Sequence, residues 1–190
     1  MTDSLDAIKN CKTCSLHKNQ LPTLDPRRSA DIFWLGISAK LYDGDAQSPL
    51  SSQTLTGSII QRIENSLPQL NFYSTNLVKC PPLNEKGKLR KPNTDEIDAC
   101  LNNFIIERDT LKPRIIFLLG KLVAKKVLNV IQENCDIKLD NIFQYHFAIH
   151  DKTIYVPIHH PSYIGVYKRK DVESYISSIQ ELIIKRLEEE

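Results

Sequence analysis

The chain has 190 residues, of which 41% are hydrophobic and 25% are charged, and these are ordinary values for a soluble globular protein. A chain of this length is most simply one domain with a sizeable core, so we expect a single domain over residues 1–190. The formal net charge of +2 excludes a uniformly basic protein, so any contact with nucleic acid has to come from local basic clusters.

The first residues lack the basic start and apolar run of a secretory signal, and no apolar stretch is long enough to span a membrane. We therefore expect a cytoplasmic protein with no membrane partner. In that compartment, five cysteines indicate metal ligation or chemistry rather than disulfides.

Hydrophobic patterns predict strands and helices that alternate along the chain. Short apolar runs that end at glycine or proline predict buried strands at 31–36, from Tyr73 up to Pro81, and at 114–120. Helices are expected within residues 1–18 and at 54–67, 93–110, 121–132 and 171–190. Residues 143–149 and 153–157 form either a hairpin or a surface strand that leads into the last core strand, and 159–163 is a loop.

This alternation predicts an α/β fold, a three-layer α/β/α sandwich around a central, mostly parallel four-stranded sheet. In such sheets the binding site lies outside the carboxyl ends of the strands. The loops at that edge are 37–52, 80–92 and 159–169, so we expect the site where these three meet.

Four of the cysteines are placed to form one site. Cys11 and Cys14 make a CxxC pair, and Cys80 and Cys100 lie near the ends of expected elements. Together they would close an N-terminal segment, residues 1–18, onto the body of the protein. Their spacing alone suits zinc and an iron–sulfur cluster about equally, and buried unbound thiols are the simplest alternative. Cys135 is expected to be a free thiol.

Several motifs occur in a specific order: CxxC near the start, TNLVKCPP, a cysteine-bearing helix that begins PNTDE, the strand IIFLLG, and HPSY near the end. In this order, over nearly the whole chain, the sequence resembles the uracil-DNA glycosylase superfamily, and particularly its iron–sulfur branch (family 4 and its relatives). In that branch four cysteines hold a [4Fe–4S] cluster. The resemblance therefore implies this cluster at the four cysteines named above, with zinc as the less favoured alternative.

The resemblance also implies roles for individual residues. Asn76 matches the asparagine that reads the edge of a flipped pyrimidine, and an amide can pair with two adjacent groups on a base. His160 matches the histidine that hydrogen-bonds the base carbonyl and stabilises charge on the departing base. Ser162 and Tyr163 begin the loop that enters the DNA minor groove. On residue type alone, Asn76 could instead cap a turn, and His160 could be a satisfied histidine at a strand end.

The first family motif, approximately GEAPGxxEDxxGxPFVG, is altered at residues 36–52. Ile37 stands where the family has Glu, and Leu50 stands where it has the Phe that stacks on the base. Asp43 falls on the first acid of the motif and is a candidate for positioning water, although a solvated loop acid is at least as plausible. Lys40 could place a charge on phosphate or on a modified base. We expect the base to be bound by Asn76, Leu50, Ile37, Gly36 and Ser38.

Two basic clusters flank the expected site and would contact phosphate without reading sequence. They are Lys88, Arg90 and Lys91 in one loop, and Lys168 and Arg169 in another. For any single one of these residues, a solvated surface position has equal weight.

The sequence therefore predicts a monomeric, monofunctional DNA glycosylase that removes a damaged or modified pyrimidine and leaves an abasic site. The altered first motif is compatible with a bulkier pyrimidine, such as a hypermodified cytosine of phage DNA, as well as with a uracil-like base in DNA repair. The alternatives are a catalytically weak, damage-sensing DNA-binding relative and a metal-bearing scaffold for another protein.

Overall fold

One five-stranded sheet, in the order β2-β1-β3-β5-β4, forms the centre of the computed structural model, which describes residues 4–41 and 48–189. The strands are β1 (Ile32–Ser38), β2 (Phe72–Val78), β3 (Ile115–Leu119), β4 (Ala148–His150) and β5 (Thr153–Ile158). Strand β1 pairs in parallel with β2 and β3, and β3 pairs in parallel with β5. The expected α/β class and the mostly parallel sheet are confirmed.

The expected number of four strands is wrong, because β4 adds a fifth at the edge. It pairs antiparallel with β5, and His150 faces Thr153 across a two-residue turn. Both turn residues, Asp151 and Lys152, have positive φ angles, of 47° and 67°. Such φ values match the twist of a tight hairpin, but Asp-Lys is a weak turn signal compared with Asn-Gly.

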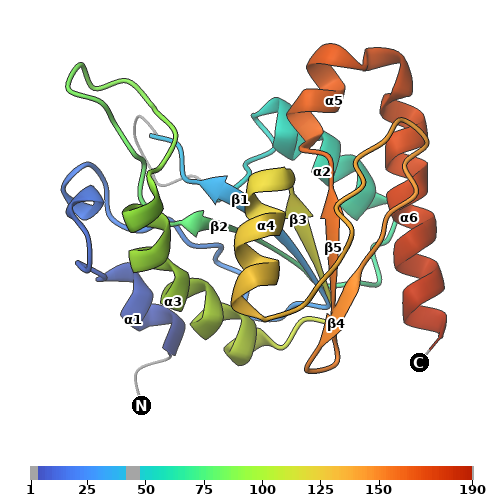
Figure 1. Cartoon of the computed structure of the whole chain (residues 1–190), viewed down its shortest axis with the longest axis horizontal. Coiled ribbons are helices and arrows are strands. Elements are labelled where there is room, and N and C mark those ends of the chain that lie inside the picture. The colour runs from blue at the N-terminus through green and yellow to red at the C-terminus, as the bar shows by residue number, and fades with distance from the viewer. Residues whose placement is uncertain (1–3, 42–47, 190) are drawn as a thin grey trace.

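Helices cover both faces of the sheet (Figure 1). The six α-helices of the described residues are α1 (Ser4–Lys9), α2 (Leu55–Asn65), α3 (Thr94–Leu111), α4 (Lys121–Val130), α5 (Pro161–Tyr167) and α6 (Val172–Glu188). Short 3₁₀ turns lie at Ser15–Lys18 and Arg169–Asp171. No helix among the described residues has both the length and the apolar character that crossing a membrane requires.

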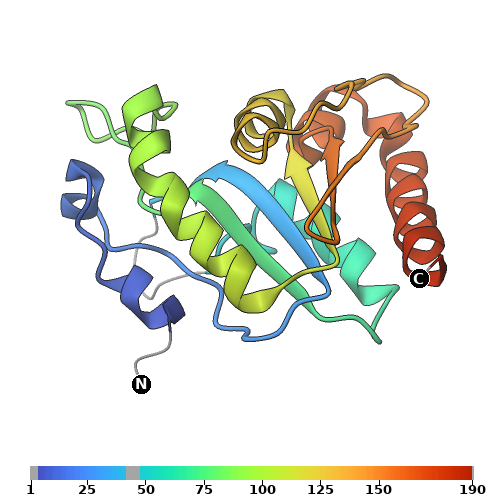
Figure 2. The ribbon, with the colours of Figure 1, turned by 60° about the horizontal axis from the view of Figure 1, so that its bottom comes forward.

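The side chains of β1 alternate between the two faces, as expected for a strand that is buried on both sides. Phe33 and Leu35 belong to a core shared with α3 and α4, whereas Ile32 and Trp34 belong to a core shared with α2, α5 and α6. Figure 2 shows α3 lying across the face of β1 and β2. This double burial explains why apolar runs identified the central strands correctly.

Helix α5 lies where the sequence predicted a loop, so that expectation is wrong. His160 is the N-cap of this helix and Pro161 is its first residue. Proline is favoured at this position because its φ is already helical and its missing N–H has no partner to lose. The loop after β5 is therefore a rigid helix start, which fixes the position of His160.

The edge of β2 is covered by the segment that follows the first cysteine pair. The backbone N–H of Thr23 donates to the Lys79 carbonyl at 2.9 Å, and the Asn19 side chain donates to the Pro81 carbonyl at 2.9 Å. The buried Asp25 carboxylate accepts the backbone N–H of Ser74 at 2.9 Å. These bonds occupy polar groups that an open sheet edge would leave unpaired.

A buried ion pair joins the end of β2 to α3. Lys79 and Glu107 are both 0% exposed, and the Lys79 ammonium contacts the Glu107 carboxylate directly. Glu107 also accepts hydrogen bonds from Tyr73 Oη at 2.9 Å and from Thr75 Oγ1 at 2.9 Å. Lys79 donates to the Thr75 hydroxyl at 2.7 Å and to the backbone carbonyl of Asn76 at 2.6 Å. The charges are therefore compensated by both an ion pair and hydrogen bonds.

Replacing Glu107 by leucine leaves the Lys79 charge buried without its partner, and we expect the free energy of unfolding to fall by about 3–5 kcal/mol. The double variant Lys79→Met/Glu107→Leu removes both charges and should recover much of this loss. Urea denaturation followed by circular dichroism measures the free energy of unfolding of both variants. Glu181→Leu, an exposed change on α6, is the control and should stay within about 0.5 kcal/mol. A loss below about 1 kcal/mol for Glu107→Leu contradicts this account.

Candidate functional site

A pocket of about 200 Å³ lies at the carboxyl ends of β1, β2 and β5. Segments from all three expected loops line it, as the parallel-sheet rule predicts. Six of the expected site residues contribute to its wall: Ile37, Ser38, Leu50, Asn76, Arg90 and His160. Asp43, the other expected catalytic residue, lies outside the described residues.

Asn76 faces this pocket from the end of β2, directly opposite Gly36 of β1. Its side chain is only 4% exposed, and among the described residues its amide has no hydrogen-bond partner. A Cβ atom at residue 36 would collide with Asn76 Oδ1, so the glycine makes room for the amide. The amide does not cap a turn and is free to pair with a ligand.

Leu50 forms another wall and is held there by its own loop. Its φ angle of 55° is unusual for a bulky residue. Thr54, the N-cap of α2, donates its hydroxyl to the Ser51 carbonyl at 2.8 Å and accepts the Gly57 N–H at 3.1 Å. A Cβ at Gly57 would collide with the carbonyl oxygens of Leu50 and Ser51. The loop is therefore packed directly on the first turn of α2.

His160 reaches the pocket from the start of α5. Its Nδ1 lies 2.8 Å from Ser162 Oγ, which leaves Nε2 for the pocket. Burial lowers the pKa of His160 below its ordinary value, and the nearby charge of Lys40 lowers it further. A ring with a lowered pKa is neutral at pH 7, and it donates from Nε2 when the Ser162 hydroxyl donates to Nδ1.

His159 lies away from the pocket. Its ring stacks on Tyr163, with centroids 6.1 Å apart, and meets Phe143 edge-on at 5.6 Å. Its backbone carbonyl accepts the buried Tyr175 hydroxyl at 2.7 Å. The two adjacent histidines therefore point apart, and His159 is part of the core.

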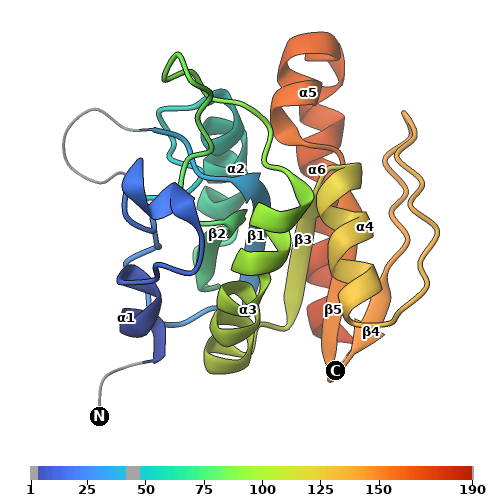
Figure 3. The same cartoon turned by 60° about the vertical axis from the view of Figure 1, so that its left-hand side comes forward.

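The two basic clusters lie at the same end of the molecule as the pocket. Figures 1 and 3 both show the 81–92 loop and α5 projecting at the top of the view. Lys88, Lys91 and Arg169 are exposed there. Lys168 is bonded to the Asn141 side chain, and Tyr163 is 43% exposed.

Arg90 differs from the other basic residues because its guanidinium is already occupied. It makes two bonds to the Glu96 carboxylate, at 2.8 and 2.5 Å, and one to the Leu83 carbonyl at 3.0 Å. Glu96 also closes the capping box of α3 with Asn93. Arg90 thus fixes the 81–92 loop as a pocket wall, and a phosphate contact by Arg90 stays a prediction.

The four cysteines of the expected metal site lie around one end of α3. Cys11 follows α1, Cys14 precedes a 3₁₀ turn, Cys80 follows β2, and Cys100 is in the second turn of α3. Burial raises the pKa of the Cys80 thiol to about 12, and the charges of Cys100, Cys14 and Cys11 add to this effect. All four thiols are thus close enough to influence one another.

Polar N–H groups point at two of these sulfurs. Asn103 Nδ2 lies 3.4 Å from Cys11 Sγ and 3.6 Å from Cys100 Sγ, and the Lys79 backbone N–H lies 3.4 Å from Cys100 Sγ. Asn103 was not expected from the sequence, although its position three residues after Cys100 on a helix would have suggested it. Within residues 4–41 and 48–189, no three His, Cys, Asp or Glu side chains are grouped so that they could hold one metal ion.

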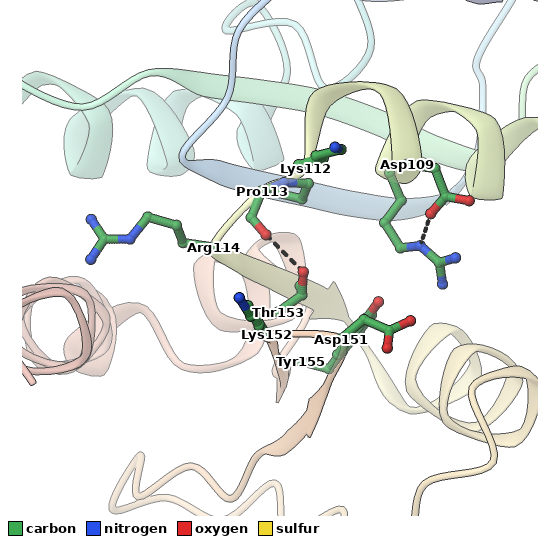
Figure 4. A pocket seen from close by; sticks show the side chains of 9 residues that line it. Asp109, Lys112, Pro113, Arg114, Asp151, Lys152, Thr153 and Tyr155 are labelled. Carbon is green, nitrogen blue, oxygen red and sulfur yellow. Dashed lines mark hydrogen bonds and ion pairs between the residues drawn. The ribbon is translucent and has the colours of Figure 1, made fainter. Parts of the chain in front are cut away.

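A wider pocket of about 580 Å³ lies at the opposite end of the sheet, beside the amino ends of β3 and β5 (Figure 4). Lys112 ends α3 there, where a positive charge complements the helix carbonyls. Arg108 pairs with Asp109 at 2.7 Å, and Arg114 donates to the Leu187 carbonyl at 3.1 Å. These charges have a structural explanation, and no expected site residue lines this pocket.

Comparison with known proteins agrees with this geometry. The family model described as "Uracil DNA glycosylase superfamily" matches residues 22–183. A type-4 uracil-DNA glycosylase of Archaeoglobus fulgidus is 24% identical, with 98% of this chain and 94% of that protein covered. The type-4 uracil-DNA glycosylase of Sulfurisphaera tokodaii is 30% identical, with 96% of this chain and 86% of that protein covered. That of Pyrobaculum aerophilum is 31% identical, and the match covers 66% of this chain but only 63% of that protein. Since the family model extends over most of the chain, this protein belongs to the uracil DNA glycosylase superfamily, whose members are DNA glycosylases.

Proposed function

We propose that this chain is a monofunctional DNA glycosylase. It hydrolyses the N-glycosidic bond of a flipped-out pyrimidine in DNA and leaves an abasic site. The observation that carries the proposal is the buried amide of Asn76, which shares a pocket with His160 and has no hydrogen-bond partner among the described residues. Among the described residues, Asn76 is not one of the fully enclosed polar groups that lack a partner, so its amide is open to the pocket, where a bound base edge is a natural partner for it.

The geometry supports a division of roles within the pocket. Asn76 pairs with the base edge and so holds the base in register. His160, positioned by Ser162, donates a hydrogen bond from Nε2 to the base oxygen as negative charge develops there. The pocket is small, which suits a single base extruded from the stack.

The shape of the pocket supports a uracil-like base or a bulkier pyrimidine. Leu50 offers an aliphatic wall, and Ile37 offers a second apolar one in place of the family's Glu. Neither can hydrogen-bond a base, so these walls select by shape rather than by polar contacts. Removal of a hypermodified cytosine from phage DNA, as a defence activity, stays a prediction.

DNA is the proposed partner, held by the exposed lysines of the 81–92 loop and by the residues around α5. Contacts of this kind fix orientation on the duplex without reading its sequence. We propose that the protein acts as a monomer, since the pocket is formed within one chain.

A second candidate, a DNA-binding relative with weak or no turnover, is favoured by one specific observation. Among the described residues that line the pocket, none is a carboxylate that could position the attacking water. Asp43, which could do so, lies outside the described residues. The two candidates are separated by whether any base is released.

We further propose that Cys11, Cys14, Cys80 and Cys100 hold a [4Fe–4S] cluster that ties the N-terminal segment to α3. The donor set fits, because four thiols lie near one another and N–H groups point at two of the sulfurs. The cluster has a structural role here, and zinc is the less favoured alternative.

Single-turnover assays on duplex and single-stranded oligonucleotides containing uracil should yield alkali-labile abasic sites. His160→Ala should reduce the rate by about 10²–10³-fold, because it removes a donor to the departing base, and should leave DNA binding intact. His146→Ala, a change at an exposed histidine, is the control. If no base is released at enzyme excess while DNA is bound in a salt-dependent way, the binding-only candidate is correct instead.

The lowered pKa of His160 predicts the pH profile. The ring is neutral at and above its ordinary pKa of 6.5, so His160 should cause no change in rate above about pH 6.5. As the pH falls through the lowered pKa, protonation adds a second positive charge beside Lys40 and forces the Ser162 hydroxyl to accept rather than donate at Nδ1. The rate should then fall, because the ring is no longer held in the position that serves the departing base. Single-turnover rates and an NMR titration of His160 measure this. A His160 pKa at or above 6.5 would contradict the prediction.

Cys80→Ser should remove the brown colour and broad visible absorbance of the purified protein and lower its melting temperature, because one ligand of the cluster is lost. Cys135→Ser is the matched control and should keep both colour and stability, since none of the other four thiols is among the groups that influence the pKa of Cys135. Metal analysis that finds about one zinc and no iron would replace the cluster by the zinc alternative.

A further inference from the structure

The pocket contains two cations, and only one of them is free to act on a substrate. Arg90 is committed to Glu96 and to backbone carbonyls of its own loop. Lys40 is exposed, lines the same pocket and makes no hydrogen bond or ion pair with any described residue. Among the described residues that line the pocket, Lys40 is therefore the one positive charge without a partner.

The position of Lys40 is set by the sheet rather than by a free loop. Strand β1 pairs with β2 as far as Ser38 and Val78, and the next backbone N–H, that of Ala39, donates to the Val78 carbonyl at 2.9 Å. Ala39 is 2% exposed. Lys40 follows immediately, so the backbone of Lys40 is anchored at the edge of the pocket by the end of β1. Its side chain lies beside His160.

A neutral His160 can donate a hydrogen bond but brings no net charge to the departing base. The base leaves with the electron pair of the C1′–N bond and so carries a full negative charge unless it is neutralised. When bound DNA excludes water from the pocket, a positive charge there interacts with such an anion far more strongly than it would in water. The pocket therefore supplies the hydrogen bond and the charge from two different side chains.

We propose that Lys40 is a catalytic residue of this site, whose ammonium stabilises the negative charge on the pyrimidine as the C1′–N bond breaks. The inference rests on the proposed glycosylase function and deepens it. In the balanced reaction, the bond electrons go to the base, the oxygen of one water bonds to C1′, and one proton of that water ends on the released base. Lys40 keeps its own proton throughout. Its substrates are accordingly bases that leave as anions, not alkylated bases that are cationic beforehand and leave neutral.

The test compares two leaving groups in single-turnover reactions at saturating enzyme. Uracil and 5-fluorouracil in the same oligonucleotide differ in how well they carry negative charge, since fluorine stabilises the anion. Lys40→Met should slow uracil release by about 10²-fold and 5-fluorouracil release by clearly less. Lys40→Arg keeps the charge and should retain most of the rate. Lys125→Met removes the same charge from an exposed position on α4 and serves as the control.

Three other results have definite meanings. Equal losses for both bases, with weaker and less salt-dependent DNA binding, would show that Lys40 contacts phosphate and would overturn the proposal. An unchanged rate for Lys40→Met would also overturn it. Failure of the unmodified protein to release either base would reject the uracil-like substrate of the proposed function, and this inference with it.

Discussion

The buried Lys79–Glu107 ion pair connects the parts of this protein that matter for its chemistry. Lys79 lies three residues after Asn76 and one residue before Cys80, so it stands on the chain between the pocket amide and one of the thiols. Its ammonium holds the backbone carbonyl of Asn76, and its backbone N–H points at Cys100. Because a buried charge without its partner is far costlier than the intact pair, β2 and α3 cannot shift independently. The pocket amide and the thiol set are therefore fixed in one frame.

A second constraint closes the other side of the pocket. Gly57 lets the backbone of Leu50 sit directly on the first turn of α2. Gly165 does the same for α5, since a Cβ there would meet the Leu55 side chain at 2.9 Å. Gly57 thus holds the Leu50 loop against α2, and Gly165 lets α5, which begins directly after His160, pack against α2. The width of the pocket depends on these close contacts rather than on hydrogen bonds across it.

Much of this arrangement follows from the sequence, and the exceptions have physical causes. Apolar runs identified the central strands because both faces of the sheet are covered, and the parallel-sheet rule placed the pocket correctly. Helix α5 and strand β4 were missed or left open because seven- and three-residue elements carry too little periodicity. Lys79 looks like an ordinary exposed lysine in a one-dimensional pattern, since its partner Glu107 is 28 residues away. Arg90 was assigned to DNA for the same reason, because only the folded loop brings it onto Glu96.

The charges of the described pocket favour one half of the proposed reaction and oppose the other. A free ammonium at Lys40 and a neutral His160 suit a departing anion, but the sugar left behind is cationic. Positive charge alone would therefore help the base to leave and hinder the formation of the sugar cation. The compensating negative charge has to come from outside the described lining: from the DNA phosphates that flank the flipped nucleotide, or from Asp43 of the altered first motif. In the first case the phosphates of the substrate supply the negative charge that stabilises the sugar cation in the transition state. The rate of base release should then depend on intact phosphates around the target base.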